Sequence, residues 1–237
     1  MDQPHVEQRG GSGAVIGLVV LLVAAAVALR WMTATLSQGT PASGRGAPIA
    51  PGVVRPPSPQ DHRRGPANAP ITVVEYVDLE CPYCKQFHAT LQAFVNQPDL
   101  AGHVAWVYRH LPVAEVHPKA RREAEAAECA GELGGDDKFW AYVDRVFAVT
   151  PSNNGLDPAQ LPAIAGQLGL DRDAFLSCLD SGRHRARVDA DADEAYRAGA
   201  EGTPFTVVLG PTGRAYPING VVSPEELALI VAQVAQE

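Results

Sequence analysis

The sequence predicts an α/β domain in the order βαβ, helical insert, ββα, following an amino-terminal membrane anchor. An apolar, β-branched run from Ile71 to Val77 is followed by residues at helical spacing and then by a second strand pattern, His103 to Tyr108. Near the carboxyl end, the strand patterns Phe205 to Leu209 and Ala215 to Ile218 flank a Pro-Thr-Gly turn. About 90 residues between these two parts have helical patterns, which predicts one domain interrupted by an insert.

A long apolar segment lies near the amino terminus. Residues 14–29 are all apolar or glycine, sixteen in succession, slightly fewer than the roughly 20 that cross a bilayer as a helix. Flanking residues extend this run, so we expect an uncleaved anchor over residues 14–36 after a cytoplasmic segment, residues 1–13. The alternative is a cleaved signal peptide, but that needs a basic segment first, and residues 1–13 carry two acids against one arginine.

Residues 37–66 form the next distinct segment. They contain seven prolines and five glycines without a hydrophobic period, which predicts an extended linker that need not fold. The folded domain then covers residues 67–237. Residues 1–70 carry six arginines against three acids, whereas the remainder carries 13 basic against 24 acidic residues. Such an acidic domain argues against a nucleic-acid partner.

The insert, about residues 113–202, is expected to be helical throughout. Helical spacing of apolar residues covers 117–133, 137–149, 158–168, 171–179 and 183–198. After the last hairpin, Ser223-Pro224-Glu225-Glu226 combines a serine N-cap, proline at the first helical position and glutamate at the third. These signals predict a final helix.

The dithiol Cys81-Pro82-Tyr83-Cys84 lies between the first strand and the following helix. The same spacing would suit half of a zinc site, but zinc needs four ligands, and the sequence has neither a second CxxC nor a suitably spaced histidine pair. We therefore favour redox chemistry and expect no metal. The helix amino terminus should lower the pKa of Cys81 and make it the attacking thiolate, with Cys84 shielded as the resolving thiol. Pro82 lacks an N–H where none is needed, and Tyr83 is available to shape the mouth of the site.

Three further residues are candidates for a role. Glu75 interrupts the apolar first strand; if it is buried its pKa rises and it can carry protons, whereas at a sheet edge it would be solvated. Cys129 and Cys178 are far apart in the chain. They can be buried free thiols or a structural bridge, and four cysteines allow three pairings.

Together these features resemble the DsbA-like branch of the thioredoxin superfamily. The resemblance covers about Pro66 to Glu237. Its further matching segments are Ala69 to Tyr76, Arg109-His110-Leu111-Pro112, Lys138-Phe139-Trp140 and Gly202-Thr203-Pro204-Phe205.

The resemblance implies a thioredoxin fold and several site residues. It implies that Pro204 follows a cis peptide bond and lies against the dithiol, and that Thr203 contacts the substrate backbone. Glu75 occupies the position at which family members carry an acidic residue, six positions before the first cysteine. A subset of the family has a second disulfide in the insert, which implies a bridge between Cys129 and Cys178.

We therefore expect a thiol:disulfide oxidoreductase, without cofactor, that forms disulfides in secreted proteins. Because disulfides persist in oxidising compartments, we expect a single-pass protein with its carboxyl-terminal domain outside the cytoplasm, in the periplasm or at the cell exterior. Its expected partners are thiols of secreted or membrane proteins and a membrane redox protein that reoxidises it, and we expect a monomer. The alternatives are a disulfide reductase or isomerase on the same fold, or a non-catalytic chaperone or interaction module.

Overall fold

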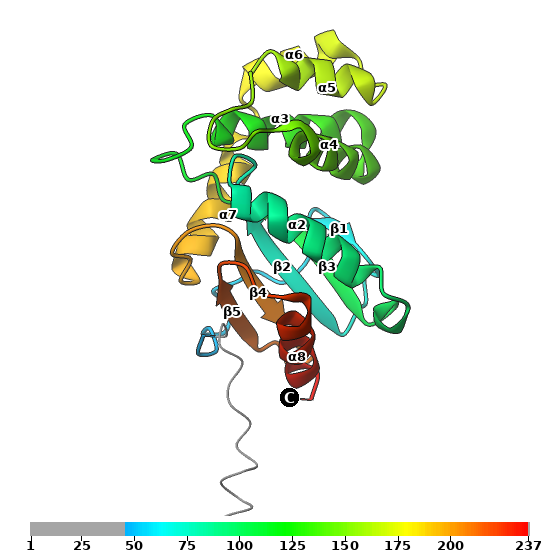
Figure 1. Ribbon diagram of the computed structural model, residues 1–237, viewed down its shortest axis with the longest axis vertical. Helices are drawn as coiled ribbons and strands as arrows, with labels where there is room; N and C mark the ends of the chain where they lie inside the picture. The colour runs from blue at the N-terminus through cyan, green and yellow to red at the C-terminus, as the bar shows by residue number, and fades with distance from the viewer. Residues whose placement is uncertain (1–45, 237) are drawn as a thin grey trace, which may run out of the picture. The chain divides into compact units, whose positions relative to one another are not determined.

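The computed structural model describes residues 46–236, and in this part of the chain five strands form one mixed sheet (Figure 1). Their order across the sheet is β1-β3-β2-β4-β5. The strands are β1 (His62–Arg64), β2 (Ile71–Val77), β3 (Val104–His110), β4 (Phe205–Leu209) and β5 (Ala215–Asn219). β2 and β3 run parallel, and the other neighbouring pairs are antiparallel. This confirms the predicted α/β class and adds one strand, β1, to the four expected.

The helices follow the predicted order. They are α2 (Pro82–Val95), η1 (Pro98–Leu100), α3 (Ala120–Gly134), α4 (Asp136–Val149), α5 (Gln160–Gln167), α6 (Arg172–Ser181), α7 (Arg185–Arg197) and α8 (Pro224–Val234). The predicted cap of the last helix is present, because the Ser223 hydroxyl accepts a hydrogen bond from the Glu226 amide at 3.1 Å. The first insert helix begins at Ala120 rather than at residue 117, where the chain forms a turn instead.

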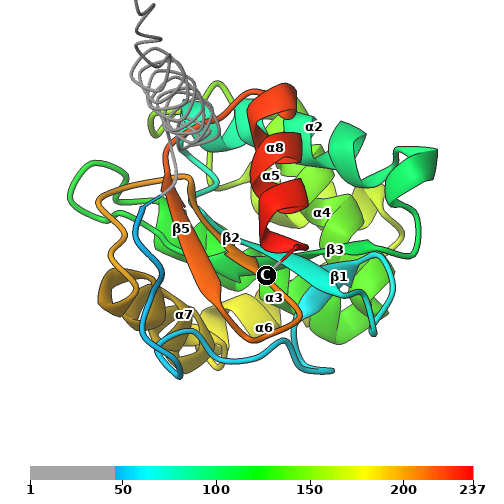
Figure 2. The same ribbon diagram turned by 90° about the horizontal axis from the view of Figure 1, so that it is seen from below.

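The sheet has two apolar faces, and each is covered by helices. α2 and α8 lie on one face, and α7 lies on the other (Figure 2). Side chains alternate along β2, so that Val73 and Val77 pack in the cluster with α2 whereas Val74 and Tyr76 pack in the cluster with α7. Glu75 shares the register of Val73 and Val77 and therefore points towards α2.

The insert helices extend the larger cluster beyond the sheet. α3 and α4 lie next to the sheet layer, and α5 and α6 form the outer pair (Figure 1). A disulfide joins Cys129 of α3 to Cys178 of α6, with 5.9 Å between their Cα atoms. The disulfide closes the loop of chain between Cys129 and Cys178, which stabilises the fold by about 4 kcal/mol in the chain-entropy model. The bridge therefore ties the outer helices to the inner ones.

The predicted linker is wrong from residue 46 onward, because these residues pack on the domain. The Ile49 amide donates to the Ala215 carbonyl at 2.8 Å, and His62–Arg64 pair with β3. Between β1 and β2, Gly65 adopts a φ of +100°, and a Cβ there would lie 2.8 Å from the Val104 carbonyl oxygen. β1 was not predicted because it lies in a proline-rich segment and has no hydrophobic period.

A buried polar network holds this segment against the α7 side of the sheet. The Arg109 guanidinium is fully buried and donates to Asp61 at 2.9 Å and to Glu194 at 2.6 Å. The Tyr76 hydroxyl also donates to Glu194, at 2.6 Å. Arg55 donates through its backbone amide to Glu194 and through its guanidinium to Asp191. Charged side chains therefore attach the residues before β1, together with the buried Val54 and the partly buried Ile49 and Val53, which pack in the cluster on the α7 side.

Two predicted segments, the cytoplasmic residues 1–13 and the anchor over 14–36, lie outside the described residues. Within residues 46–236, no helix combines the length and apolar character needed to cross a membrane.

Replacing Arg109 with Met is expected to lower the free energy of unfolding by about 3–5 kcal/mol, because it deprives the buried Asp61 and Glu194 carboxylates of a cation. Urea unfolding followed by circular dichroism measures this loss. Arg197 is exposed at the end of α7, so Arg197→Met is a matched control that should change stability by less than about 0.5 kcal/mol. Equal stability of the two variants would contradict the role of the network.

Candidate active site

The dithiol lies where β2 gives way to α2. Cys81 is the N-cap residue of α2, and its amide donates to the Asp78 carbonyl at 3.2 Å. Pro82 occupies the first helical position, where an N–H would have no partner in the helix. Pro82 and Tyr83 are exposed, Tyr83 at 62%, whereas both cysteines are buried and reduced. The two middle residues therefore form the outer surface of the motif.

The environment of the Cys81 sulfur favours its ionised form. A hydrogen bond from the Cys84 thiol, together with the backbone N–H groups of Cys84 and Tyr83, outweighs burial and lowers the pKa of Cys81 to about 6. These amides belong to the first turn of α2, where N–H groups lack partners within the helix. At neutral pH Cys81 is therefore largely a thiolate, the form that attacks disulfides.

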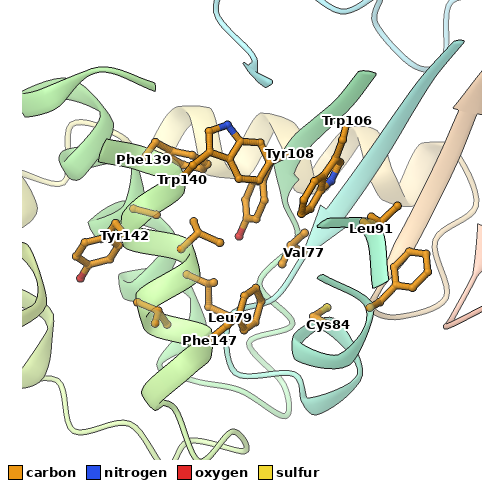
Figure 3. Packing of buried hydrophobic residues seen from close by; sticks show 14 of the residues in the cluster. Val77, Leu79, Cys84, Leu91, Trp106, Tyr108, Phe139, Trp140, Tyr142 and Phe147 are labelled. Carbon is orange, nitrogen blue, oxygen red and sulfur yellow. The ribbon is translucent and has the colours of Figure 1, made fainter. Parts of the chain in front are cut away.

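Cys84 has the opposite environment. Its side chain is fully buried in the apolar cluster that includes Leu79, Leu91 and Phe147 (Figure 3). Burial is the main reason that its pKa is raised, and the neighbouring Cys81 and Glu75 add to the effect. The Asp78 amide donates to its sulfur at 3.5 Å. The two thiols thus differ strongly in acidity although they are one helical turn apart.

The segment before β4 closes the site over Cys81. The Thr203–Pro204 peptide bond is cis, and the Cys81 sulfur lies 3.4 Å from the Thr203 carbonyl oxygen. Thr203 is partly exposed and Pro204 is buried. The structure therefore brings Thr203 and Pro204 against the dithiol, although they follow it by more than a hundred residues.

Glu75 is buried rather than solvated at an edge. It lies on β2, which has strands on both sides, and is fully inaccessible. The Trp106 indole donates to one carboxyl oxygen at 3.1 Å, and the other has no partner among the described residues. Burial, with a smaller contribution from Cys81, raises the pKa of Glu75 to about 8. The group can therefore hold a proton at neutral pH beside the buried thiol.

Asp78 and His117 also belong to the site, and sequence reasoning missed both roles. The Asp78 carboxylate is buried and accepts from the Val113 amide at 2.8 Å and from His117 Nδ1 at 3.0 Å. In the sequence, His117 is only the first residue of a predicted insert helix, residues 117–133. The sequence signal available was an aspartate three residues before the first cysteine, and nothing in the pattern paired it with a histidine 39 positions later.

A single group of three possible metal ligands occurs among residues 46–236. Cys129, Cys178 and His184 place their ligand atoms within 4.8 Å of one another. The two sulfurs are bonded to each other, so neither is available as a thiolate ligand. This group is therefore a disulfide with a neighbouring imidazole.

A comparison with family models matches residues 57–219 to the thioredoxin family. The chain belongs to that family. Among solved structures, DsbA2 of Pseudomonas aeruginosa is 30% identical, with a TM-score of 0.67 over 77% of this chain and 98% of that one. This makes the protein a DsbA-like member of the family and a protein-disulfide oxidoreductase by class. BdbD of Bacillus subtilis shares the fold at 19% identity and a TM-score of 0.60, over 75% of this chain and 94% of that one.

Curated relatives extend well beyond this chain. A protein of Salinispora arenicola named Na(+)/H(+) antiporter NhaA 1 is 37% identical over 202 residues, which is 82% of this chain and 29% of that protein. Na(+)/H(+) antiporter NhaA 3 of Salinispora tropica is 42% identical over 152 residues, which is 64% of this chain and 22% of that protein. The chain thus spans less than a third of the length of these relatives.

The buried Glu75 makes stability depend on pH. Its pKa is about 8 in the folded, reduced protein, against an ordinary value of 4.5. Between these values the folded state keeps a proton that the unfolded chain loses, so stability falls as pH rises, by at most about 1.4 kcal/mol per pH unit. Glu75→Gln should remove this loss and be more stable than wild type by a few kcal/mol near pH 8. Near pH 4 the difference should be small.

Urea unfolding of the reduced protein across this pH range is the measurement. Glu201→Gln is the matched control, because Glu201 is exposed and the substitution should leave the profile unchanged. If the free energy of unfolding changed with pH in the same way for Glu75→Gln and wild type, Glu75 would be ionised in the folded state.

Proposed function

We propose that this protein is a thiol oxidant that transfers its Cys81–Cys84 disulfide to cysteine pairs of secreted or membrane proteins. One observation carries the proposal, namely the contrast in acidity between the two thiols. A hydrogen-bonded, low-pKa Cys81 stabilises the reduced enzyme, and a reduced form that is stabilised makes the corresponding disulfide a stronger oxidant.

The proposed reaction has two exchange steps. A substrate thiolate attacks the Cys81 sulfur of the oxidised enzyme, a mixed disulfide forms, and the bond to Cys84 breaks with its electron pair left on the Cys84 sulfur. A second substrate thiolate then attacks the substrate sulfur of the mixed disulfide and releases the Cys81 thiolate. The substrate is oxidised by two electrons, and the enzyme dithiol is reduced by two.

Glu75 is suited to serve the buried sulfur in this reaction. A Cys84 thiolate in an apolar cluster is unstable because burial disfavours the charged form. A protonated Glu75 can supply the proton that neutralises it and recover that proton when the enzyme is reoxidised. Pro82 and Tyr83 shape the exposed mouth, and the partly exposed Thr203 is available to substrate backbone.

Membrane attachment and an extracytoplasmic position are part of the proposal. The apolar run of residues 14–29 is long enough, with its flanks, to serve as a single-pass anchor. The relatives named as antiporters, which by that name work in membranes, combine a region similar to this chain with other segments. A membrane redox protein is the proposed reoxidising partner, and the protein acts as a monomer.

A reductase or isomerase on the same fold remains the second candidate, since both reactions use a low-pKa first cysteine. The redox potential separates it from the oxidant. We expect a value nearer about −120 mV, as for a strong oxidant, than about −270 mV, as for thioredoxin. The full chain is equilibrated with glutathione buffers, and tryptophan fluorescence reports the state of the dithiol. Cys81→Ser is the control and should show no transition. A value near that of thioredoxin would favour the reductase.

The location can be tested separately by cysteine labelling in intact cells. Ser43→Cys lies beyond the proposed anchor and should react with a membrane-impermeant maleimide, whereas Gln3→Cys should react only after permeabilisation. Unsubstituted protein gives the background from its own cysteines. Protection of the cysteine at position 43 in intact cells would place the domain in the cytoplasm and refute the proposed topology.

A further inference from the structure

An imidazole is hydrogen-bonded to Asp78, the residue whose backbone contacts both cysteines, and it has no part in the reaction described above. His117 belongs to the loop between β3 and α3, and its side chain is 10% exposed. Its Nδ1 lies 3.0 Å from a carboxylate oxygen of Asp78. Its carbonyl accepts from the Ala120 amide at 3.0 Å. Asp78 therefore holds the ring, and the first residue of α3 holds the backbone of the same residue.

Asp78 connects this imidazole to both cysteines. Its amide donates to the Cys84 sulfur at 3.5 Å, and its carbonyl accepts from the Cys81 amide at 3.2 Å. Its carboxylate accepts from His117 and from the amides of Glu80 and Val113. Three donors on one buried carboxylate orient it fully, so the position of the imidazole is fixed relative to the dithiol.

The surroundings of His117 are rich in acids. His117 itself interacts with Asp78, Asn153 and Cys81. Asp78 in turn acts on Glu123 of α3 and on Tyr196 of α7; Glu123 also interacts with Glu80 and Lys119, and Tyr196 with Glu115. The ammonium groups of Lys85 and Lys119 are hydrogen-bonded to backbone carbonyls of residues 150–156. The Asp78 carboxylate opposes a thiolate at Cys81, and an imidazolium at His117 compensates it.

We propose that His117, oriented by Asp78, is a positioning residue for thiol–disulfide exchange, whose positive charge stabilises the Cys81 thiolate. This inference rests on the proposed function, because it requires Cys81 to be the attacking and leaving thiol. The imidazolium acts on the thiolate through space, while Asp78 keeps it in place and keeps it protonated.

The pKa of His117 is raised. Burial acts to lower it, but the hydrogen bond and charge of Asp78 and the interactions with Asn153 and Cys81 outweigh burial. The imidazolium thus persists through the range in which Cys81, with a pKa of about 6, ionises. By linkage, the His117 imidazolium favours ionisation of Cys81, and the Cys81 thiolate favours protonation of His117. Neutralising His117 should therefore raise the pKa of Cys81, and the effect on reactivity should depend on pH.

Two substitutions separate charge from hydrogen bonding. His117→Asn can keep an N–H donor near the position of Nδ1 but carries no charge, whereas His117→Ala removes both. The measurement is the rate of iodoacetamide alkylation of Cys81 in the reduced full chain from about pH 4 to 9, with the modified residue identified by mass spectrometry. His103→Asn is the control, because His103 is exposed at the start of β3.

Both variants should be alkylated about three- to tenfold more slowly near pH 5, since each unit of pKa lowers the thiolate fraction tenfold there. Above about pH 8 their rates should equal that of wild type, because Cys81 is then fully ionised. The control should match wild type throughout.

Three results would overturn the inference. A wild-type profile for His117→Asn with slow alkylation only for His117→Ala would mean that the hydrogen bond, not the charge, matters. A loss of equal size at every pH would indicate a structural role. If wild-type Cys81 ionises like an ordinary thiol, near pH 8.5, the proposed function itself fails. The first two results would contradict only the role of His117 and leave the proposed function unaffected.

Discussion

Burial of the Asp78 carboxylate at the end of β2 is the constraint on which the site depends. A buried carboxylate without partners would cost several kcal/mol, so its oxygens must find donors. They find them in the amides of Glu80 and Val113 and in the His117 imidazole, the last two in the segment between β3 and α3. Its backbone meanwhile contacts Cys81 and Cys84. One residue thus joins the central strand, the dithiol helix and the insert, and none of these can shift without breaking a hydrogen bond of a buried group.

The asymmetry of the dithiol follows from where α2 begins. At the N-cap, Cys81 meets N–H groups that have no partner in the helix, and these stabilise a negative charge. Three residues later the helix has turned Cys84 into the apolar cluster beneath the sheet, where a negative charge is disfavoured. A single helical turn therefore makes one thiol acidic and the other resistant to ionisation. Exchange at the surface and protection of the inner sulfur both require this difference.

Periodic apolar patterns made most of the fold predictable. β2, β4 and the insert helices lie where apolar runs and helical spacing placed them, because burial of apolar side chains leaves a record in the sequence. β1 and the attachment of residues 46–61 left no such record. β1 pairs with β3 through its backbone, and the segment before it is held by a few apolar side chains and by Arg109, Asp61 and Glu194, a pairing of charges far apart in the chain that has no period. For the same reason the dithiol and Glu75 could be recognised from the local sequence, whereas the partnership of Asp78 with His117 could not.

Net charge illustrates why composition describes this site poorly. The formal charge of −8 counts every carboxyl as ionised, which would oppose a thiolate. Glu75 and Glu123 are buried, and burial, together with the adjacent Glu80 for Glu123, raises the pKa of each well above its ordinary value. Both are therefore largely neutral at pH 7, and the charge of Asp78 is matched by His117. The field at Cys81 is consequently less negative than the composition implies, because Glu75 and Glu123 are neutral and the charge of Asp78 is matched by an imidazolium.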